Sequence, residues 1–341
     1  MNGAPGRRYV VLAEGRLSAA KTAHGVLRYG RDEVVAVLDS TLAGQTVGGA
    51  MPGLLTDPGR DAPIVATLVE ALAYAPTSIL VGVAPAGGRL PGEWMETLGE
   101  AAGARLEIVA GLHQRLASAF PGARVWDVRE PPGEVPIFSG EGLDVGPKVA
   151  LTVGTDAAIG KMTATLEIER AARKAGVSTG FVPTGQTGVI IAGWGVCVDA
   201  VVSDFVAGVS EMLVLEAAKS SSDMILVEGQ GALSHPAYSG VTLGLLHGSC
   251  PDCLVLCVSP DDAPGYAGVS RPTPARAVRL YEEVSALVKP APVVAVSANT
   301  KGLTEDEARA FVEKVSDETG LPAADPVRQT AEPILEAVMG S

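Results

Sequence analysis

The sequence predicts an α/β protein with two domains, each built around a mainly parallel sheet. Short runs of Val, Leu, Ile and Ala alternate with longer amphipathic segments along the 341 residues. Pro and Gly are concentrated in residues 131–147, which are weakly periodic and indicate a linker. We therefore expect one domain over residues 1–135 and a second over residues 146–341, each long enough to bury its own core.

Five apolar runs in the first half are expected to form strands, at residues 8–13, 33–39, 78–84, 106–111 and 124–129. Amphipathic segments predict helices at residues 66–75 and 112–120. A polar segment that includes Lys21 follows the first strand, and Asp39 closes the second. This layout is Rossmann-like, but the GxGxxG fingerprint of a dinucleotide site is absent. We expect this domain to contribute substrate contacts or an oligomer surface.

The second half predicts five strands, at residues 148–153, 179–183, 223–229, 253–259 and 292–298. These runs are apolar without alternation, which is typical of strands covered on both faces. Helices are expected at residues 161–176, 274–288 and 304–320. The last begins with Thr304 and Glu307, the pair of a capping box, and ends near Gly320.

A glycine-rich turn joins the first strand of the second half to its first helix. Such a turn directs backbone N–H groups outward at the positive end of the helix dipole, where phosphate binds. A lysine at the helix start adds a positive charge. The sequence therefore predicts a phosphate-binding P-loop, and a P-loop NTPase-like second domain. The expected contacts to the phosphorylated ligand are Gly154, Thr155, Ala158, Ile159, Gly160, Lys161, Met162 and Thr163.

Two features of this loop depart from the usual GxxxxGK pattern. The spacing is one residue longer, and Met162 occupies the position where Ser or Thr would hold magnesium. Thr163 follows one residue later and points about 100° away on a helix. A phosphorylated carrier that needs no metal, such as coenzyme A, therefore fits at least as well as magnesium-ATP, and we assign no metal ligands. Asn299, which follows the last strand, could contact a nucleotide base.

Acidic residues near this loop are the candidates for proton transfer. Glu228 ends a buried strand just before Gly-Gln-Gly, and Asp156 lies inside the loop. Either carboxylate could remove a proton from a substrate amine, although Asp156 could instead cap the following helix. We expect Glu228, Asp156 and Lys161 to form the catalytic set.

Substrate contacts are expected from polar residues at other strand ends. Thr184, Gln186 and Thr187 follow the second strand of this half, where a ligand-facing loop of an open α/β sheet lies. His235 is the best placed of the four histidines for acid–base work at the substrate, although a structural role is the default for a lone histidine. Arg328 could bind a carboxylate or form a surface ion pair.

The overall composition excludes several classes of protein. A net charge of −13 argues against a nucleic-acid binder. No apolar run approaches the roughly 20 residues of a membrane span, and the N-terminus lacks a secretory signal. The four cysteines, at positions 197, 250, 253 and 257, favour structural roles in a reducing compartment. We expect a cytoplasmic enzyme.

Three segments together resemble the D-glutamate N-acetyltransferase family. They are GTDAAIGKMT at 154–163, PTGQTGVIIAGWGVCVDAVVSDFVAG at 183–208 and ILVEGQGAL at 225–233. The resemblance implies a Rossmann-like N-terminal domain, a P-loop C-terminal domain and a homo-oligomer. It also implies acetyl transfer from acetyl-CoA to the amine of an acidic amino acid, D-glutamate above all.

The loop and the VEGxG strand end also resemble dethiobiotin synthetase and related P-loop ligases, which use ATP with magnesium to form amides. That gives the alternative activity, an ATP-dependent amide-forming ligase. A third reading is a nucleotide-binding regulator without catalysis. The number of polar residues at the strand ends after the P-loop favours a catalytic pocket over this reading.

Overall fold

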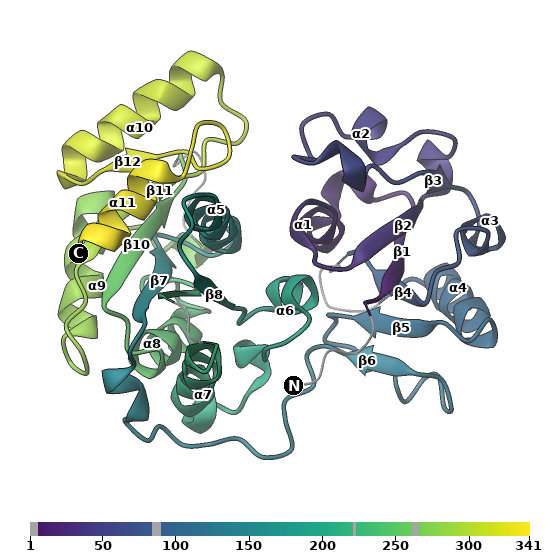
Figure 1. Ribbon diagram of the computed structural model, residues 1–341, viewed down its shortest axis with the longest axis horizontal. Helices are drawn as coiled ribbons and strands as arrows, with labels where there is room; N and C mark the ends of the chain where they lie inside the picture. The colour runs from purple at the N-terminus through teal and green to yellow at the C-terminus, as the bar shows by residue number, and fades with distance from the viewer. Residues whose placement is uncertain (1–5, 84–89, 221–222, 261–265) are drawn as a thin grey trace. The chain divides into compact units, whose positions relative to one another are not determined.

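The computed structural model describes residues 6–83, 90–220, 223–260 and 266–341. Its contacts divide the chain into two compact units. The first unit contains Met1–Glu130 and Gln186–Trp194, and the second contains Pro131–Gly185 and Gly195–Ser341. The first unit thus takes a short segment from the second half of the sequence, which the sequence did not indicate. The predicted α/β class is confirmed, with one parallel sheet in each unit (Figure 1).

The first unit holds a six-stranded sheet in the order β3-β2-β1-β4-β5-β6, with every pair parallel. This is the doubly wound order of Rossmann-like folds. Its strands are β1 (Arg8–Leu12), β2 (Glu33–Leu38), β3 (Ile64–Val65), β4 (Ser78–Val81), β5 (Glu107–Ala110) and β6 (Val125–Asp127). Its helices are α1 (Lys21–Tyr29), α2 (Val47–Ala50), α3 (Leu68–Leu72), α4 (Gly92–Gly103) and α6 (Gln186–Ala192).

The expected helix at residues 112–120 is wrong. The Asp127 carboxylate at the end of β6 accepts hydrogen bonds from the backbone N–H groups of Leu116 and Ala117, at 3.0 Å each. These bonds satisfy the backbone in a turn, so the apolar spacing of the segment does not continue as a helix. The expected helix at 66–75 shortens to α3, and the last residue of the expected strand 78–84 lies outside the described residues.

The second unit also holds a six-stranded parallel sheet, in the order β12-β11-β10-β7-β9-β8. Its strands are β7 (Lys148–Gly154), β8 (Thr179–Val182), β9 (Met224–Val227), β10 (Cys253–Val258), β11 (Val293–Ala298) and β12 (Ala323–Ala324). Its helices are α5 (Lys161–Lys174), α7 (Val206–Ala218), α8 (Ser239–Gly248), α9 (Pro274–Ser285), α10 (Glu305–Thr319) and α11 (Glu332–Gly340).

Local chemistry explains why these elements form where they do. All six residues of β10 are buried, as its continuous apolar run predicts. The capping box of Thr304 and Glu307 begins α10, and Gly320 ends it in the left-handed conformation. Apolar residues of α5 and α11, among them Ile168 and Ile334, pack together on one face of the sheet (Figure 1).

Residues 131–147 are not a loose linker. The buried carboxylate of Glu211, on α7, accepts hydrogen bonds from the backbone N–H groups of Ser139 (2.6 Å) and Gly142 (2.9 Å). Although burial opposes it, this bonding holds the pKa of Glu211 below its usual value. Gly208 allows the segment to approach α7, since a Cβ there would lie 2.1 Å from the carbonyl oxygen of Pro136. The segment is therefore an ordered part of the second unit.

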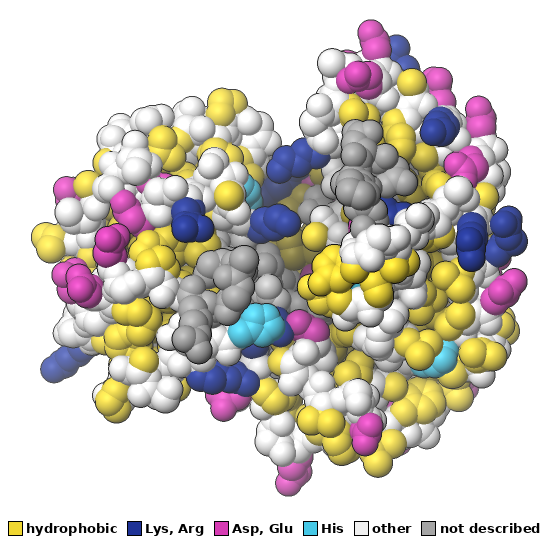
Figure 2. Space-filling model, turned by 180° about the vertical axis from the view of Figure 1, so that it is seen from behind, with side chains coloured by type: hydrophobic (Ala, Val, Ile, Leu, Met, Phe, Trp, Pro, Cys, Tyr) yellow, Lys and Arg dark blue, Asp and Glu magenta, His cyan; other side chains and the backbone are white. Residues whose placement is uncertain are grey.

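The surface and the cysteines of the described residues do not mark a functional site. Within the described parts of the chain, no helix has both the length and the apolar character to cross a bilayer. The four cysteines are buried with free thiols. On the face drawn in Figure 2, acidic side chains are scattered singly or in small groups. The negative net charge therefore does not mark a binding surface on that face.

The strand order of the second unit predicts a ligand-binding site at one edge of its sheet. β7 and β10 are neighbours, but the chain leaves β7 toward β8 and leaves β10 toward β11. Ligands of open α/β sheets bind at such a switch point, outside the carboxyl ends of the strands. The P-loop follows β7 at this point.

Candidate active site at the P-loop

The loop from Gly154 to Lys161 joins β7 to α5 and turns sharply. Ala158 (φ 58°) and Gly160 (φ 106°) both have left-handed backbone. At Gly154 a Cβ would lie 2.9 Å from Cδ1 of Ile159, so the absence of a side chain lets the loop fold onto its own strand. Lys161 is the first residue of α5, and the N–H groups of that first turn have no partner within the helix. Such a helix start is suited to bind phosphate.

Lys161 is buried in the curve of the loop, with only 5% of its surface exposed. Its Nζ donates a hydrogen bond to the carbonyl oxygen of Asp156 at 2.7 Å. Burial lowers the pKa of Lys161 to about 8, against the opposite effect of Cys257, Asp156 and Glu228 nearby. An anion bound beside it would favour the charged form of the lysine.

No hydroxyl group directly follows this lysine. Met162 holds that position, and Thr163 comes one residue later. The next hydroxyl, of Thr165, donates to the carbonyl oxygen of Lys161 (2.9 Å) and lies 3.0 Å from that of Thr152. It therefore stabilises the start of α5 and does not replace the magnesium-binding hydroxyl of nucleotide-hydrolysing P-loops.

The Asp156 side chain joins the loop to two residues from other parts of the unit. Its Oδ1 accepts from the N–H of Ala157 at 2.6 Å and lies 3.7 Å from Nε2 of His235. Its Oδ2 lies 2.5 Å from Nε of Arg271. The structure thus brings together Asp156 and His235, both expected at the site, and adds Arg271. That arginine lies in a Pro-containing segment without periodicity, so the sequence did not single it out.

His235 is oriented by its neighbours. The N–H of Ala237 donates to Nδ1 at 3.2 Å, which places the proton of a neutral ring on Nε2, facing Asp156. The rings of Tyr238 and Tyr266 lie 4.5 and 4.7 Å from the imidazole, between centroids. The lone pair of Nδ1 is occupied by a backbone donor. His235 therefore suits orientation of Asp156 better than removal of a substrate proton.

Glu228 lies at the end of β9 and is almost completely buried, with 5% exposed. Its Oε2 accepts from the N–H groups of Thr184 (3.0 Å) and Gly185 (3.2 Å). Burial raises the pKa of Glu228 to about 7, although these two N–H donors act in the opposite direction. A carboxylate with a pKa near neutrality can take up a proton during a reaction at pH 7.

The chain around Glu228 is tied closely to the neighbouring strands. The Thr184 hydroxyl donates to the Glu228 carbonyl oxygen at 2.7 Å, and the Gln230 amide donates to Thr184. The N–H of Gly229 donates to the Thr152 hydroxyl at 2.9 Å. Backbone and side chains therefore fix the Glu228 carboxylate beside the P-loop strand β7.

Two of the expected ligand contacts, Gln186 and Thr187, have partners elsewhere in the structure. Gln186 and Thr187 do not continue a ligand-facing loop with Thr184. They begin α6 in the first unit, where Gln186 accepts from Arg129 (3.2 Å) and Thr187 lies 3.2 Å from the hydroxyl of Thr22. The apolar run that follows them, Val189–Ile191, is buried and explains the helix.

Arg328 has partners of its own in the second unit. Its guanidinium pairs with Glu305 at 3.2 Å and donates to the Leu303 carbonyl oxygen at 2.8 Å. This is the surface ion pair that the sequence left open as one of the two roles of Arg328. Asn299 lies next to the loop, and its Nδ2 donates to the carbonyl oxygen of Ile159 at 3.0 Å.

A buried tyrosine on α9 connects two parts of the site. The Tyr281 hydroxyl donates to the Gly154 carbonyl oxygen at 2.8 Å and accepts from the Leu233 N–H at 3.1 Å. Burial raises the pKa of Tyr281 to about 12, so the hydroxyl keeps its proton at neutral pH. It thus holds the start of the P-loop against the segment that leads to His235.

Comparisons with known proteins identify the family. Residues 136–335 match the family model described as "Domain of unknown function (DUF1611_C) P-loop domain". Residues 40–131 match the companion model "Domain of unknown function (DUF1611_N) Rossmann-like domain". A protein of Tritonibacter scottomollicae named D-glutamate N-acetyltransferase is 34% identical over 336 residues, 94% of each chain. The chain belongs to the D-glutamate N-acetyltransferase family.

Other members of the family agree with this assignment. A second D-glutamate N-acetyltransferase, from a Pseudoalteromonas species, is 34% identical over 280 residues, which cover 79% of this chain and 83% of that relative. The crystal structure of a DUF1611 family protein from Anabaena variabilis ATCC 29413 is 37% identical, with a TM-score of 0.90 over 98% of this chain and all of that one. The protein is therefore an enzyme, an N-acetyltransferase with a Rossmann-like and a P-loop domain.

We expect Tyr281→Phe to lower the free energy of unfolding by about 1–3 kcal/mol, because the partly buried Leu233 N–H loses its acceptor and the buried Gly154 carbonyl oxygen loses its donor. Urea denaturation followed by circular dichroism measures the change. Tyr74→Phe is the matched control, since Tyr74 is 42% exposed. Equal stability of the two variants would show that the Tyr281 hydroxyl contributes nothing to holding the loop.

Proposed function

We propose that this N-acetyltransferase moves the acetyl group of acetyl-CoA to the amine of D-glutamate. The names of two relatives, each 34% identical, support the acceptor. The observation that carries the chemistry is Glu228, a buried carboxylate with its pKa raised to about 7 at the strand end beside the P-loop. Acetyl transfer to an amine needs such a base, because an amino acid is mostly protonated on nitrogen at neutral pH.

In this proposal the P-loop holds the phosphates of acetyl-CoA. The free N–H groups at the start of α5 donate to phosphate oxygens, and Lys161 supplies a positive charge. The lack of a hydroxyl directly after Lys161 is no obstacle, since coenzyme A binds without a metal bridge. A magnesium nucleotide would lose one of its usual ligands here.

The reaction follows from the position of Glu228. Its carboxylate takes a proton from the ammonium group of the acceptor, and the nitrogen lone pair attacks the thioester carbon. The carbonyl oxygen becomes an oxyanion, which backbone N–H groups near Glu228 stabilise. When the C–S bond breaks, the electron pair leaves with sulfur. The nitrogen loses its second proton, which passes to the thiolate, and Glu228 releases the first proton to solvent, giving coenzyme A and N-acetylglutamate.

The direct test is release of free thiol from acetyl-CoA with D-glutamate as acceptor, in EDTA and without nucleotide. L-glutamate serves as the control. We expect thiol release that depends on D-glutamate. Absence of release from folded protein, with ADP formed from magnesium-ATP instead, would overturn acetyl transfer in favour of the ligase.

Lys161→Met should raise the KM for acetyl-CoA by about tenfold or more, because it removes a charge-assisted hydrogen bond to phosphate and keeps most of the apolar part of the side chain. Initial rates at varied acetyl-CoA measure the effect. Lys174→Met, at the exposed end of the same helix, is the control. An unchanged KM for the Lys161 variant would place the phosphates elsewhere.

A further inference from the structure

A pocket of about 370 Å³ lies at the carboxyl ends of β10 and β11. A volume of this size falls within the range of small-molecule sites, about 300–1,000 Å³. The loops that follow the two strands line it, with Ser259, Pro260, Asn299, Lys301, Gly302 and Leu303. The proposed reaction has given no role to this pocket.

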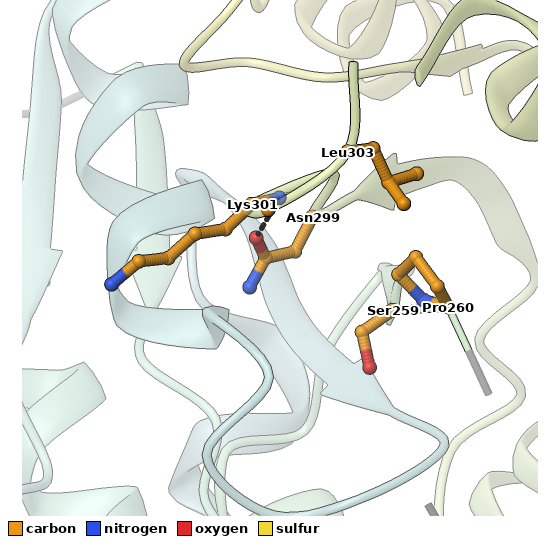
Figure 3. Close-up of a pocket in the computed structure, with 6 residues that line it drawn as sticks. Ser259, Pro260, Asn299, Lys301 and Leu303 are labelled. Atoms are coloured by element: carbon orange, nitrogen blue, oxygen red, sulfur yellow. Dashed lines mark hydrogen bonds between the residues drawn. The ribbon is translucent and has the colours of Figure 1, made fainter. Parts of the chain in front are cut away.

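Asn299 joins the pocket to the P-loop. Its Nδ2 donates to the Ile159 carbonyl oxygen (3.0 Å), and its Oδ1 accepts from the backbone N–H of Lys301 (3.1 Å) (Figure 3). The P-loop is close enough that a Cβ on Gly160 would lie 3.4 Å from Nδ2 of Asn299. When a ligand binds with its phosphates on the P-loop, the group attached to those phosphates therefore lies beside this pocket.

The two sides of the pocket differ in chemistry. Pro260 and Leu303 lie on one side together with Ser259, and the Lys301 side chain extends in the opposite direction (Figure 3). The apolar surfaces of Pro260 and Leu303 suit the flat face of an aromatic base, and the Ser259 hydroxyl can bond its polar edge. The exposed ammonium group of Lys301 suits an anion at the rim, next to the base.

The strand order separates this pocket from the proposed base. β11 and β9 lie on opposite sides of the P-loop strand β7, three strand spacings apart, or about 14 Å. Glu228 lies at the end of β9. A ligand that spans both places must be long, with a base at one end and its reacting group at the other. Acetyl-CoA has this form, with a 3′-phosphorylated adenosine, a pyrophosphate and a thioester in sequence.

We propose that this pocket binds the adenosine of coenzyme A and that Lys301 pairs with its 3′-phosphate. The proposal rests on acetyl-CoA as the donor in the proposed function. It makes Lys301 the residue that distinguishes coenzyme A from ATP and ADP, which lack a phosphate at this position.

The test compares coenzyme A with 3′-dephospho-coenzyme A by titration calorimetry. We expect the wild-type protein to bind coenzyme A about fivefold more tightly, the effect of one partly exposed ion pair. Lys301→Gln should abolish this preference by weakening coenzyme A alone. Lys314→Gln, an exposed lysine on α10, should keep it.

Equal affinity of the wild-type protein for both ligands would overturn this site, as would an equal loss for both in the Lys301 variant. Binding is measured without turnover, so the result is independent of the thiol-release assay. A protein with the expected preference but no D-glutamate-dependent release would contradict acetyl transfer and keep the site. Failure to bind either ligand would overturn both proposals.

Discussion

Replacing Glu228 with Gln is expected to lower kcat for acetyl transfer by about a hundredfold to ten-thousandfold, the usual contribution of a general base. Gln keeps the shape of the side chain, and its carbonyl oxygen can still accept from the Thr184 and Gly185 N–H groups. The loss would therefore report proton transfer and not disorder of the loop. Glu313→Gln, on the exposed face of α10, is the control. A kcat close to that of the wild type would remove Glu228 from the reaction.

The same carboxyl group predicts how the rate depends on pH. Only the ionised form accepts a proton, and the pKa of Glu228 is raised to about 7 by burial. For the wild type, kcat/KM should rise with pH and reach half of its plateau near pH 7 on the acid side. A half-point near 4.5, the ordinary value for Glu, would contradict the assignment.

Glu228→Gln should lower activity but raise the free energy of unfolding relative to the wild type at neutral pH. Because the folded-state pKa is raised, the folded protein binds this proton more tightly than the unfolded chain. Wild-type stability therefore falls as the pH rises from about 4.5 to 7, by up to about 3 kcal/mol. Gln does not ionise. In urea denaturation, the free energy of unfolding of the variant relative to that of the wild type should increase from pH 5 to pH 8. If the two free energies changed with pH in parallel, Glu228 would have an ordinary carboxyl pKa.

Gly229→Ala is expected to prevent stable folding, or to cost more than about 4 kcal/mol. A Cβ at this position would lie 1.7 Å from the carbonyl oxygen of Thr152, which is backbone of the central strand β7. Neither atom can move without separating the strand from the end of β9. Soluble yield and urea denaturation measure the effect.

Gly240→Ala is the matched control for this substitution. Gly240 lies in α8 with nothing within 4 Å of the added carbon. There the change should be neutral or slightly stabilising, because it lowers the entropy of the unfolded chain. Similar stability of the two variants would show that β7 and the end of β9 can separate at little cost.

The sequence predicted the elements whose signals are local. A buried parallel strand such as β10 is a continuous apolar run, and the P-loop combines glycines, a lysine and a fixed place between strand and helix. Glu228 was a candidate for proton transfer because it ends a buried strand of this domain, just before Gly-Gln-Gly. These inferences need only the chain neighbours of each residue and the rules of sheet topology.

Residues whose role depends on distant partners were not predicted. Arg271 lies in an irregular segment, and only the folded chain brings it to Asp156. In the sequence, Tyr281 is only one of the apolar positions of an amphipathic helix. The structure shows that its hydroxyl bonds with Gly154 and Leu233. Gln186 was assigned to a ligand because it follows a strand of the second half, whereas its partner Arg129 lies in the first unit.

The position of α6 has a consequence for synthesis of the chain. Gly111 and Thr22 contact Gln186 and Thr187, so the first unit is incomplete until the ribosome has passed residue 194. By then β7, the P-loop and α5 have also been made. The N-terminal unit cannot finish folding before translation of the C-terminal unit is well under way. A gene truncated between the two would encode a Rossmann-like sheet that lacks one of its helices.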